Sequence, residues 1–214
     1  GFTSYIDDVA MNVILNEGKA LPNAKAYKDY FRWVATGLEE PMTTHADRFK
    51  FNTGYGMSAY DKGSIFLSQL QYIIGKENFD DTLKKYFRDW SFRHPKPNDF
   101  IRSAERISGL ELDWYLLDWA QSTMTIDYSI NSVYGVDNRT KIVLKRIGQM
   151  GMPIDIKIIL DSGNSLDFNI PMTKMRGSKP LENSTLLESW SWAKPYYEFW
   201  IDVNSNKISK IEID

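Results

Sequence analysis

The helical part of the chain is decided by residues 58–74, which read SAYDKGSIFLSQLQYII. Apolar residues recur along this stretch at spacings of three and four, at Ile65, Phe66, Leu70 and Ile73. Such spacing forms one apolar face of a helix, and Gly75 follows as a stop signal. The stretch therefore predicts a strong helix that begins near Ser58 and ends near Ile74.

Helices are also predicted on both sides of this stretch. The same spacing favours a helix over residues 2–14 and a second one that Asn23 caps. Further helices are expected after Gly75, at about residues 78–90, 97–107 and 112–122. Residues 39–55 contain Pro, Thr, Asn and Gly and are predicted to form a long loop, a feature that is often functional in compact domains.

The hydrophobic period changes after Met124. From Ile126 onward apolar and polar residues alternate, as in Ile154, Ile156 and Ile158 with Asp155 and Lys157 between them. A period of two is typical of half-buried strands. About six short strands in some ninety residues suggest a small antiparallel sandwich. We therefore expect an α+β multidomain protein, with a helical domain over residues 1–124 and a β-sandwich domain over 125–214.

The composition excludes several kinds of site. The 214 residues carry a formal net charge of -2, so no basic excess favours a nucleic-acid partner. No run of apolar residues approaches the length of a membrane span. With no Cys and only His45 and His94, the chain lacks the ligands of a typical structural zinc site. The expected role for both histidines is that of surface loop or turn residues.

Tyr60 stands in the first turns of the predicted helix from Ser58, directly after the predicted loop. A helix start has free backbone N–H groups and the positive end of the dipole. A neutral phenol in this position can donate a hydrogen bond to a developing oxyanion. The alternative from the residues alone is a packed aromatic side chain, since the chain has twelve Tyr.

The motif Tyr60-Asp61-Lys62-Gly63 resembles the Y-x-K-G helix of the zinc aminopeptidase family that includes aminopeptidase N and leukotriene hydrolase, the gluzincins. Tyr55 stands five residues earlier, where some members have a second Tyr. The opening residues Gly1 to Ile6 are similar to the segment that follows the family's third zinc ligand. The order of aromatic and apolar residues from Phe79 to Trp119 is also similar to that of the family.

The resemblance implies the function and the site. It implies a zinc metallopeptidase that removes amino-terminal residues from peptides, in which Tyr60 donates to the oxyanion, with Tyr55 as the next candidate. Asp7 would hold a zinc ligand in orientation, or else be a solvated acid beside Asp8. The resemblance also implies that residues 1–124 are the helical half of a thermolysin-like catalytic domain.

The resemblance places the zinc ligands, including the H-E-x-x-H motif, upstream of Gly1. We therefore expect a fragment with no zinc of its own and little or no activity, although the full-length protein would use zinc and a peptide substrate. The alternative is a non-catalytic protein-interaction module, with Trp190, Trp192 and Trp200 as contact anchors. No feature of the sequence indicates a cellular location.

Overall fold

The computed structural model describes residues 1–214, which divide into two compact units. The helical unit comprises residues 1–107 and 112–123, and the sheet unit comprises residues 108–111 and 124–214. Both helices and strands are present, as the predicted α+β class requires. None of the helices is long and apolar enough to cross a membrane.

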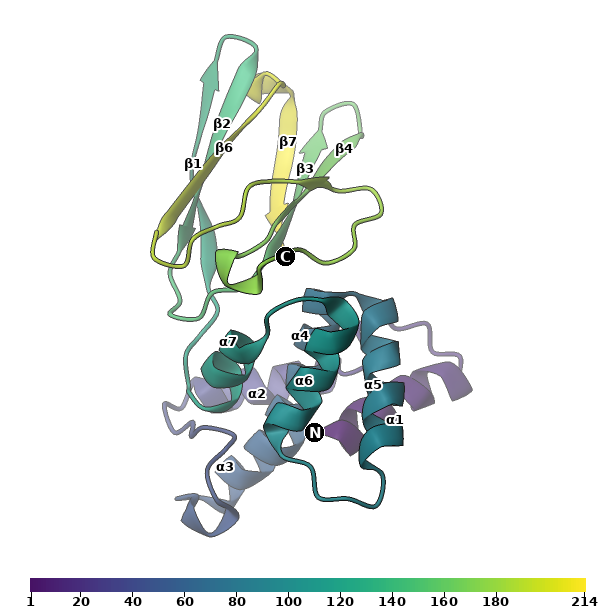
Figure 1. Cartoon of the computed structure of the whole chain (residues 1–214). Helices are drawn as coiled ribbons and strands as arrows, with labels where there is room; N and C mark the ends of the chain where they lie inside the picture. Colours follow the sequence, from purple (N-terminus) through teal and green to yellow (C-terminus); the bar gives the residue numbers. More distant parts are fainter. The chain divides into compact units, whose positions relative to one another are not determined.

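The helical unit is built around one central helical run (Figure 1). Its α-helices are α1 (Phe2–Ile14), α2 (Ala24–Val34), α3 (Asn52–Gly56), α4 (Gly63–Ile74), α5 (Lys76–Trp90), α6 (Pro97–Ser108) and α7 (Asp113–Tyr115). Short helical segments of other types are η1 (Ala46–Arg48, 3-10), η2 (Met57–Lys62, π) and η3 (Leu116–Ala120, π).

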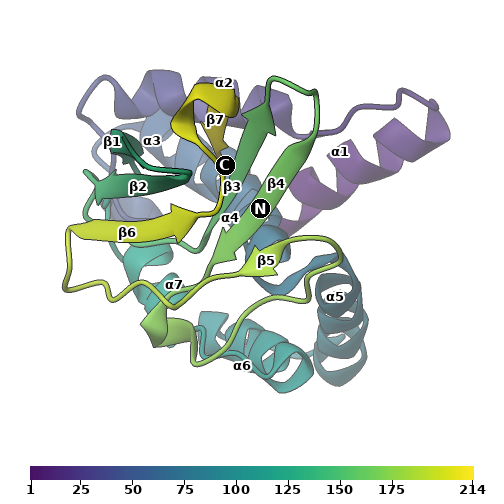
Figure 2. The ribbon, with the colours of Figure 1, turned by 90° about the horizontal axis from the view of Figure 1, so that it is seen from above.

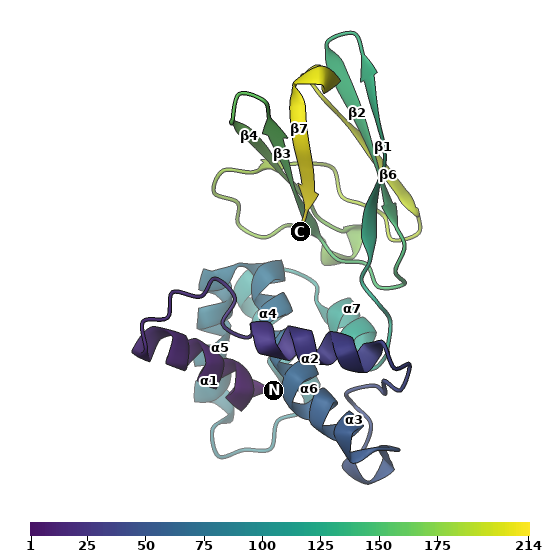
Figure 3. The same cartoon turned by 180° about the vertical axis from the view of Figure 1, so that it is seen from behind.

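The core of the helical unit forms around α4, with α1, α2 and α5 packed against it (Figures 1 and 3). Its buried apolar residues include the predicted Ile65, Phe66, Leu70 and Ile73. Tyr115, fully buried, stacks on the ring of Phe66 at 4.8 Å between centroids and donates to its carbonyl oxygen at 2.7 Å. The apolar period of residues 58–74 therefore identified the helix that organises this unit.

The start of the central helix differs from the prediction. Helical backbone begins at Asn52, so the predicted loop over residues 39–55 ends at Phe51. The turn that holds Gly54 packs beneath an indole ring, where an added Cβ would lie 3.2 Å from Trp33 Cζ2. Tertiary packing therefore overrides the low helix propensity of the glycines in this segment.

The sheet unit contains two sheets. Its strands are β1 (Tyr128–Val136), β2 (Arg139–Arg146), β3 (Ile154–Leu160), β4 (Ser165–Ile170), β5 (Thr185–Leu186), β6 (Tyr196–Ile201) and β7 (Ile208–Ile213). One sheet has the order β1-β2-β6 and the other the order β5-β4-β3-β7, with the short β5 at an edge beside β4 (Figure 2). All strand pairs are antiparallel except β4 with β5, so the wholly antiparallel arrangement that we predicted is wrong at that edge.

The two sheets share one apolar core. Ile142 and Leu144 of β2 contribute to it from one sheet, and Ile154, Ile156 and Ile158 of β3 from the other. The alternation read from the sequence in β3 is confirmed, since these three isoleucines are buried and Lys157 is exposed. Trp190 is also part of this core, so it is not available as a contact anchor.

Candidate functional site

Tyr60 lies in the middle of a continuous helical run rather than at a helix start. The run proceeds through α3, the π-helical segment η2 and α4, from Asn52 to Ile74. Tyr60 therefore follows about two turns of helix, so the free N–H groups of the helix N-terminus do not lie beside it. Its side chain is 58% exposed and is not packed in the core.

The π-helical segment η2 (Met57–Lys62) changes how the helix presents its side chains. Short π-helical stretches inside α-helices are rare and are frequent at functional sites. Five residues make about 1.4 turns of an α-helix, whereas a π-helix turns more slowly along the chain. The segment therefore reduces the angle around the helix between Tyr55 and Tyr60.

Tyr55 lies on α3 and is 38% exposed. Its ring meets that of Phe49 edge to face, with 5.7 Å between centroids. This contact limits the movement of the Tyr55 ring, whereas the more exposed ring of Tyr60 makes no such ring contact. Tyr55 and Tyr60 thus lie on the same helical run, a little more than one turn apart.

Asp7 lies on the exposed surface of α1. The pKa of its neighbour Asp8 is raised, first by burial and then by the charge of Asp7. The first residue of the chain, Gly1, lies against the Tyr60 segment, because its nitrogen donates to the carbonyl oxygen of Ala59. Asp7 is six residues further along, roughly 9 Å of helix rise away.

Glycine allows the start of α1 to approach the central helix closely. A Cβ added to Gly63 would lie 2.7 Å from the Cα of Gly1, nearer than real Cβ atoms approach. Main chain therefore touches main chain at this point. Gly63 ends the Y-x-K-G motif, so the motif's glycine has a packing function here that its position in the sequence did not reveal.

The residue that sequence reasoning missed is Lys62, whose side chain is only 3% exposed. Its ammonium lies 2.7 Å from Oε1 of Glu39, itself 8% exposed, and donates to the carbonyl oxygen of Ser122 at 3.2 Å. The rings of Tyr30 and Trp119 lie 5.7 and 5.9 Å from it. The sequence did indicate that Lys62 is unusual, since Lys62 and Asp61 are the only charged residues between Asn52 and Ile74.

The remaining electrostatics of the segment follow from burial. The hydroxyl of Tyr30 donates to Oε1 of Glu39 at 2.7 Å. Burial raises the pKa of Tyr30, and the bond to Glu39 acts in the same direction, so this phenol stays a neutral donor. Burial also raises the pKa of Asp61, which Lys25 opposes.

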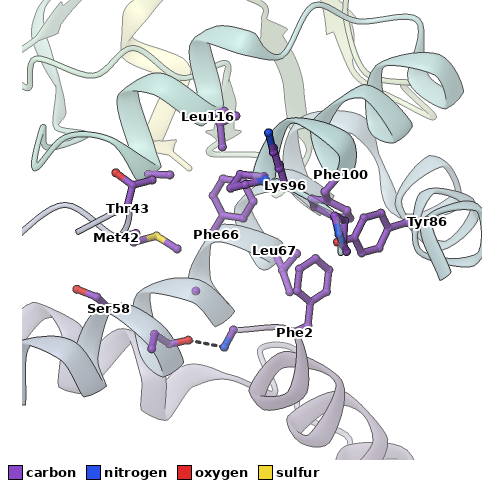
Figure 4. Close-up of a pocket in the computed structure, with 16 residues that line it drawn as sticks. Phe2, Met42, Thr43, Ser58, Phe66, Leu67, Tyr86, Lys96, Phe100 and Leu116 are labelled. Atoms are coloured by element: carbon purple, nitrogen blue, oxygen red, sulfur yellow. Dashed lines mark hydrogen bonds between the residues drawn. The ribbon is translucent and has the colours of Figure 1, made fainter. Parts of the chain in front are cut away.

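A pocket of about 430 Å³ lies in the helical unit beside this segment (Figure 4). Its walls are mostly apolar and aromatic, and Figure 4 shows Phe2, Phe100 and Tyr86 gathered on one side. The dashed line in that view is the bond from Gly1 to Ala59. Ser58, Ala59 and Gly63 line the pocket, whereas Tyr60, in the same helical run, does not.

The residues of this chain do not fit a zinc site. No group of three or more His, Asp or Glu side chains could hold a metal ion. His45 lies 3.6 Å from its neighbour Asp47, and both side chains are largely exposed. The tyrosines and the lysine described above are donors rather than zinc ligands.

Comparison with known proteins identifies the helical unit. The model of the peptidase family M1 domain matches residues 1–119, more than half of the chain. No curated protein is significantly similar in sequence.

Among solved structures, the chain is similar to the crystal structure of Legionella pneumophila aminopeptidase A in complex with aspartic acid. The TM-score is 0.50 and the sequence identity 18%, over 75% of this chain. That likeness concerns the fold. The chain spans 17% of the length of the Legionella protein.

Proposed function

This chain belongs to the peptidase family M1, and on that premise we propose that it is part of a zinc metallo-aminopeptidase that removes amino-terminal residues from peptides. The observation that carries the proposal is the family match over residues 1–119, a range that includes the whole central helical run. Zinc, when bound in the intact peptidase, polarises the scissile carbonyl and activates water. Its ligands would be residues outside these 214.

Within this proposal residues 1–124 are the helical half of a thermolysin-like catalytic domain. Residues 125–214 are a β-sandwich domain that follows it. The shared apolar core of the two sheets supports the second assignment. The central position of the family's Y-x-K-G helix in the helical unit supports the first.

Tyr60 is the residue of this chain that we assign to the reaction. Its phenol would donate to the oxyanion that develops on the scissile carbonyl, an interaction that strengthens in the transition state. Its exposure supports the role, because a donor to substrate must be reachable. Tyr55 is the next candidate for this donation, and Asp7 would orient a zinc ligand through a hydrogen bond.

The test is Tyr60→Phe in a peptidase that contains this chain. The turnover number should fall about 100-fold or more, equivalent to about 2.7 kcal/mol, with little change in the Michaelis constant. Tyr134→Phe is the matched control, since this tyrosine of β1 is similarly exposed and lies in the sheet unit. Near-full turnover of Tyr60→Phe would remove the assignment and make Tyr55→Phe the next variant.

The 214-residue chain alone should retain no tightly bound zinc after dialysis and should show little or no peptidase activity. The reason is that the proposal places all zinc ligands elsewhere. Metal analysis that finds one firmly held zinc per chain would contradict it. If a longer form of the protein also binds no zinc and cleaves no peptide, the non-catalytic interaction module becomes the better description.

A further inference from the structure

Contacts of the Tyr60 side chain do little to fix its orientation. More than half of it is exposed, so few side-chain contacts restrict it. The direction in which the phenol points is therefore set mainly by the backbone of η2, in which Tyr60 is the fourth residue. Any group that fixes this backbone also fixes Tyr60.

The backbone of η2 requires support from its surroundings. A π-helical stretch departs from the regular hydrogen-bond pattern of the helix, and sparsely populated backbone states persist only where the surrounding structure determines them. Directly before Tyr60 in the chain, the carbonyl oxygen of Ala59 accepts a hydrogen bond from the nitrogen of Gly1. Two residues after Tyr60, Lys62 is the last residue of η2.

Lys62 joins η2 to separate parts of the helical unit. Its ammonium pairs with Glu39 after α2 and donates to the carbonyl of Ser122, which follows η3. Glu39 is held in turn by the hydroxyl of Tyr30. These partners are 23 and 60 residues away in sequence, so the contacts fix the segment against distant elements.

A buried ion pair is often not the most stabilising choice for a protein interior. Well-packed apolar residues of similar volume often give equal or greater stability, whereas a charge pair demands a defined geometry. A lysine whose donors meet a carboxylate and a carbonyl at 2.7 and 3.2 Å defines the position of the main chain from which it extends. That main chain carries Tyr60 two residues earlier.

We propose that Lys62 is a positioning residue that, through Glu39 and Ser122, holds the π-helical segment in register and thereby fixes the presentation of Tyr60. The effect on catalysis rests on the proposed function of Tyr60. The effect on the backbone of residues 57–63 does not, and the two can be measured separately.

The backbone is tested in the 214-residue chain by amide hydrogen exchange. Lys62→Met leaves Glu39 buried without its cation, so Lys62→Met/Glu39→Leu is made in parallel to keep the interior neutral and the chain folded. Exchange in residues 57–63 should rise about 10-fold or more in the double variant, while α6 amides stay within about 3-fold of wild type. Lys85→Met is the control, because Lys85 pairs with Asp89 on the more exposed surface of α5.

Wild-type protection of residues 57–63 in the folded double variant would overturn the proposal, because the ion pair would then only neutralise charge. An equal rise across α6 would also overturn it, since the pair would then support the whole unit rather than this segment.

Catalysis is tested in a peptidase that contains this chain. The double variant should lose about 10-fold or more in turnover number with the Michaelis constant within about 3-fold. Adding Tyr60→Phe should cause no further loss beyond that of Tyr60→Phe alone, because Lys62 acts through Tyr60. Additive losses would overturn the proposal. If Tyr60→Phe alone is fully active, the proposed role of Tyr60 fails, and the exchange result still decides whether Lys62 holds the segment.

Discussion

The two units bury their polar side chains very differently. Two residues of the sheet unit, Thr140 and Asn169, are buried and polar. The helical unit buries six such residues: Asn23, Ser58, Lys62, Ser64, Thr82 and Ser103. Four of the six lie on, or bond to, the run from Ser58 to Ser64, since the side chain of Asn23 donates to the hydroxyl of Ser64.

The difference suggests that apolar packing stabilises the sheet unit, whereas buried polar groups in the helical unit also shape the candidate site. The sheet unit follows its alternating pattern into an apolar core, where side chains need only fill space. In the helical unit, the buried polar residues Ser58, Lys62 and Ser64 lie on or just after the π-helical segment Met57–Lys62. Departures from local rules are expected where a protein builds a functional site. The two interiors should therefore respond differently to substitution.

The largest effect is expected from Lys62→Met in the helical unit. Removing one partner of a buried ion pair leaves an uncompensated charge and typically costs about 3–5 kcal/mol. Urea unfolding followed at 222 nm, where the helical unit dominates the signal, measures the loss. Adding Glu39→Leu should recover most of it; if the loss persists, the cost arises from packing or from the Tyr30 hydroxyl, which then lacks its acceptor, rather than from the stranded carboxylate.

In the sheet unit the comparable loss should come from an apolar residue. Ile158 is fully buried in the core between the two sheets. Ile158→Ala should lower the local stability by about 3 kcal/mol through lost burial and the cavity that remains. Native-state hydrogen exchange of β3 amides reports it. A loss below about 1 kcal/mol would show that this core collapses readily and is not close-packed.

Alkaline pH should destabilise both units. The pKa of Tyr5 in the helical unit is raised to about 12, first by burial and then by Asp80, and that of Tyr197 in the sheet unit is raised to about 12 by burial and then by Glu188. Each tyrosine keeps its proton in the folded state above its ordinary pKa of about 10. Stability is therefore complete below pH 10 and falls between about pH 10 and 12.

Because each pKa is raised from about 10 to about 12, this loss is at most about 3 kcal/mol for each tyrosine, and less for the more exposed Tyr197. Tyr5→Phe should reduce the part that belongs to the helical unit, where the pKa of Tyr30 is also raised, seen as a urea midpoint at 222 nm that changes less between pH 9 and 11.5. An unchanged pH dependence in this variant would assign the alkaline loss to other groups.

The smallest effect is expected from Lys141→Met on β2. Lys141 pairs with Glu198 at 2.8 Å, almost the distance of the Lys62–Glu39 pair, but the two side chains are 26% and 62% exposed. Exposed pairs contribute about 0–1 kcal/mol, because water screens them and either partner is solvated alone. The β2 amides should therefore keep nearly wild-type exchange. A loss comparable with that of Lys62→Met would show that burial does not explain the difference between the pairs.

Most of the secondary structure was predictable because it follows from local periodicity. The helix over residues 2–14, the end of the central helix at Gly75 and the alternation in β3 all depend on neighbours along the chain. The start of the central helix was not predictable. Gly54 is a poor helix former, and it is helical because an indole from α2, Trp33, covers it.

The candidate site was predictable only in part, for the same reason. The motif identified Tyr60, but its place two turns inside a helix and its π-helical backbone depend on tertiary contacts. The pairing of Lys62 with Glu39 joins residues 23 positions apart through a buried network. From the sequence alone, a lysine next to an aspartate, such as Asp61-Lys62, is expected on the solvent-exposed face of a helix.

The contact of main chain with main chain at Gly63 affects how the motif can be used to recognise relatives. Any side chain at this position meets the backbone of Gly1, which cannot rotate away as a side chain would. Selection for folding alone would then retain the glycine, even in a descendant copy that had lost all catalysis. Among related sequences, the last letter of Y-x-K-G should therefore mark inheritance of the helix packing, whereas the tyrosine and the lysine that positions it should be the letters of this motif that differ between working peptidases and inactive descendants.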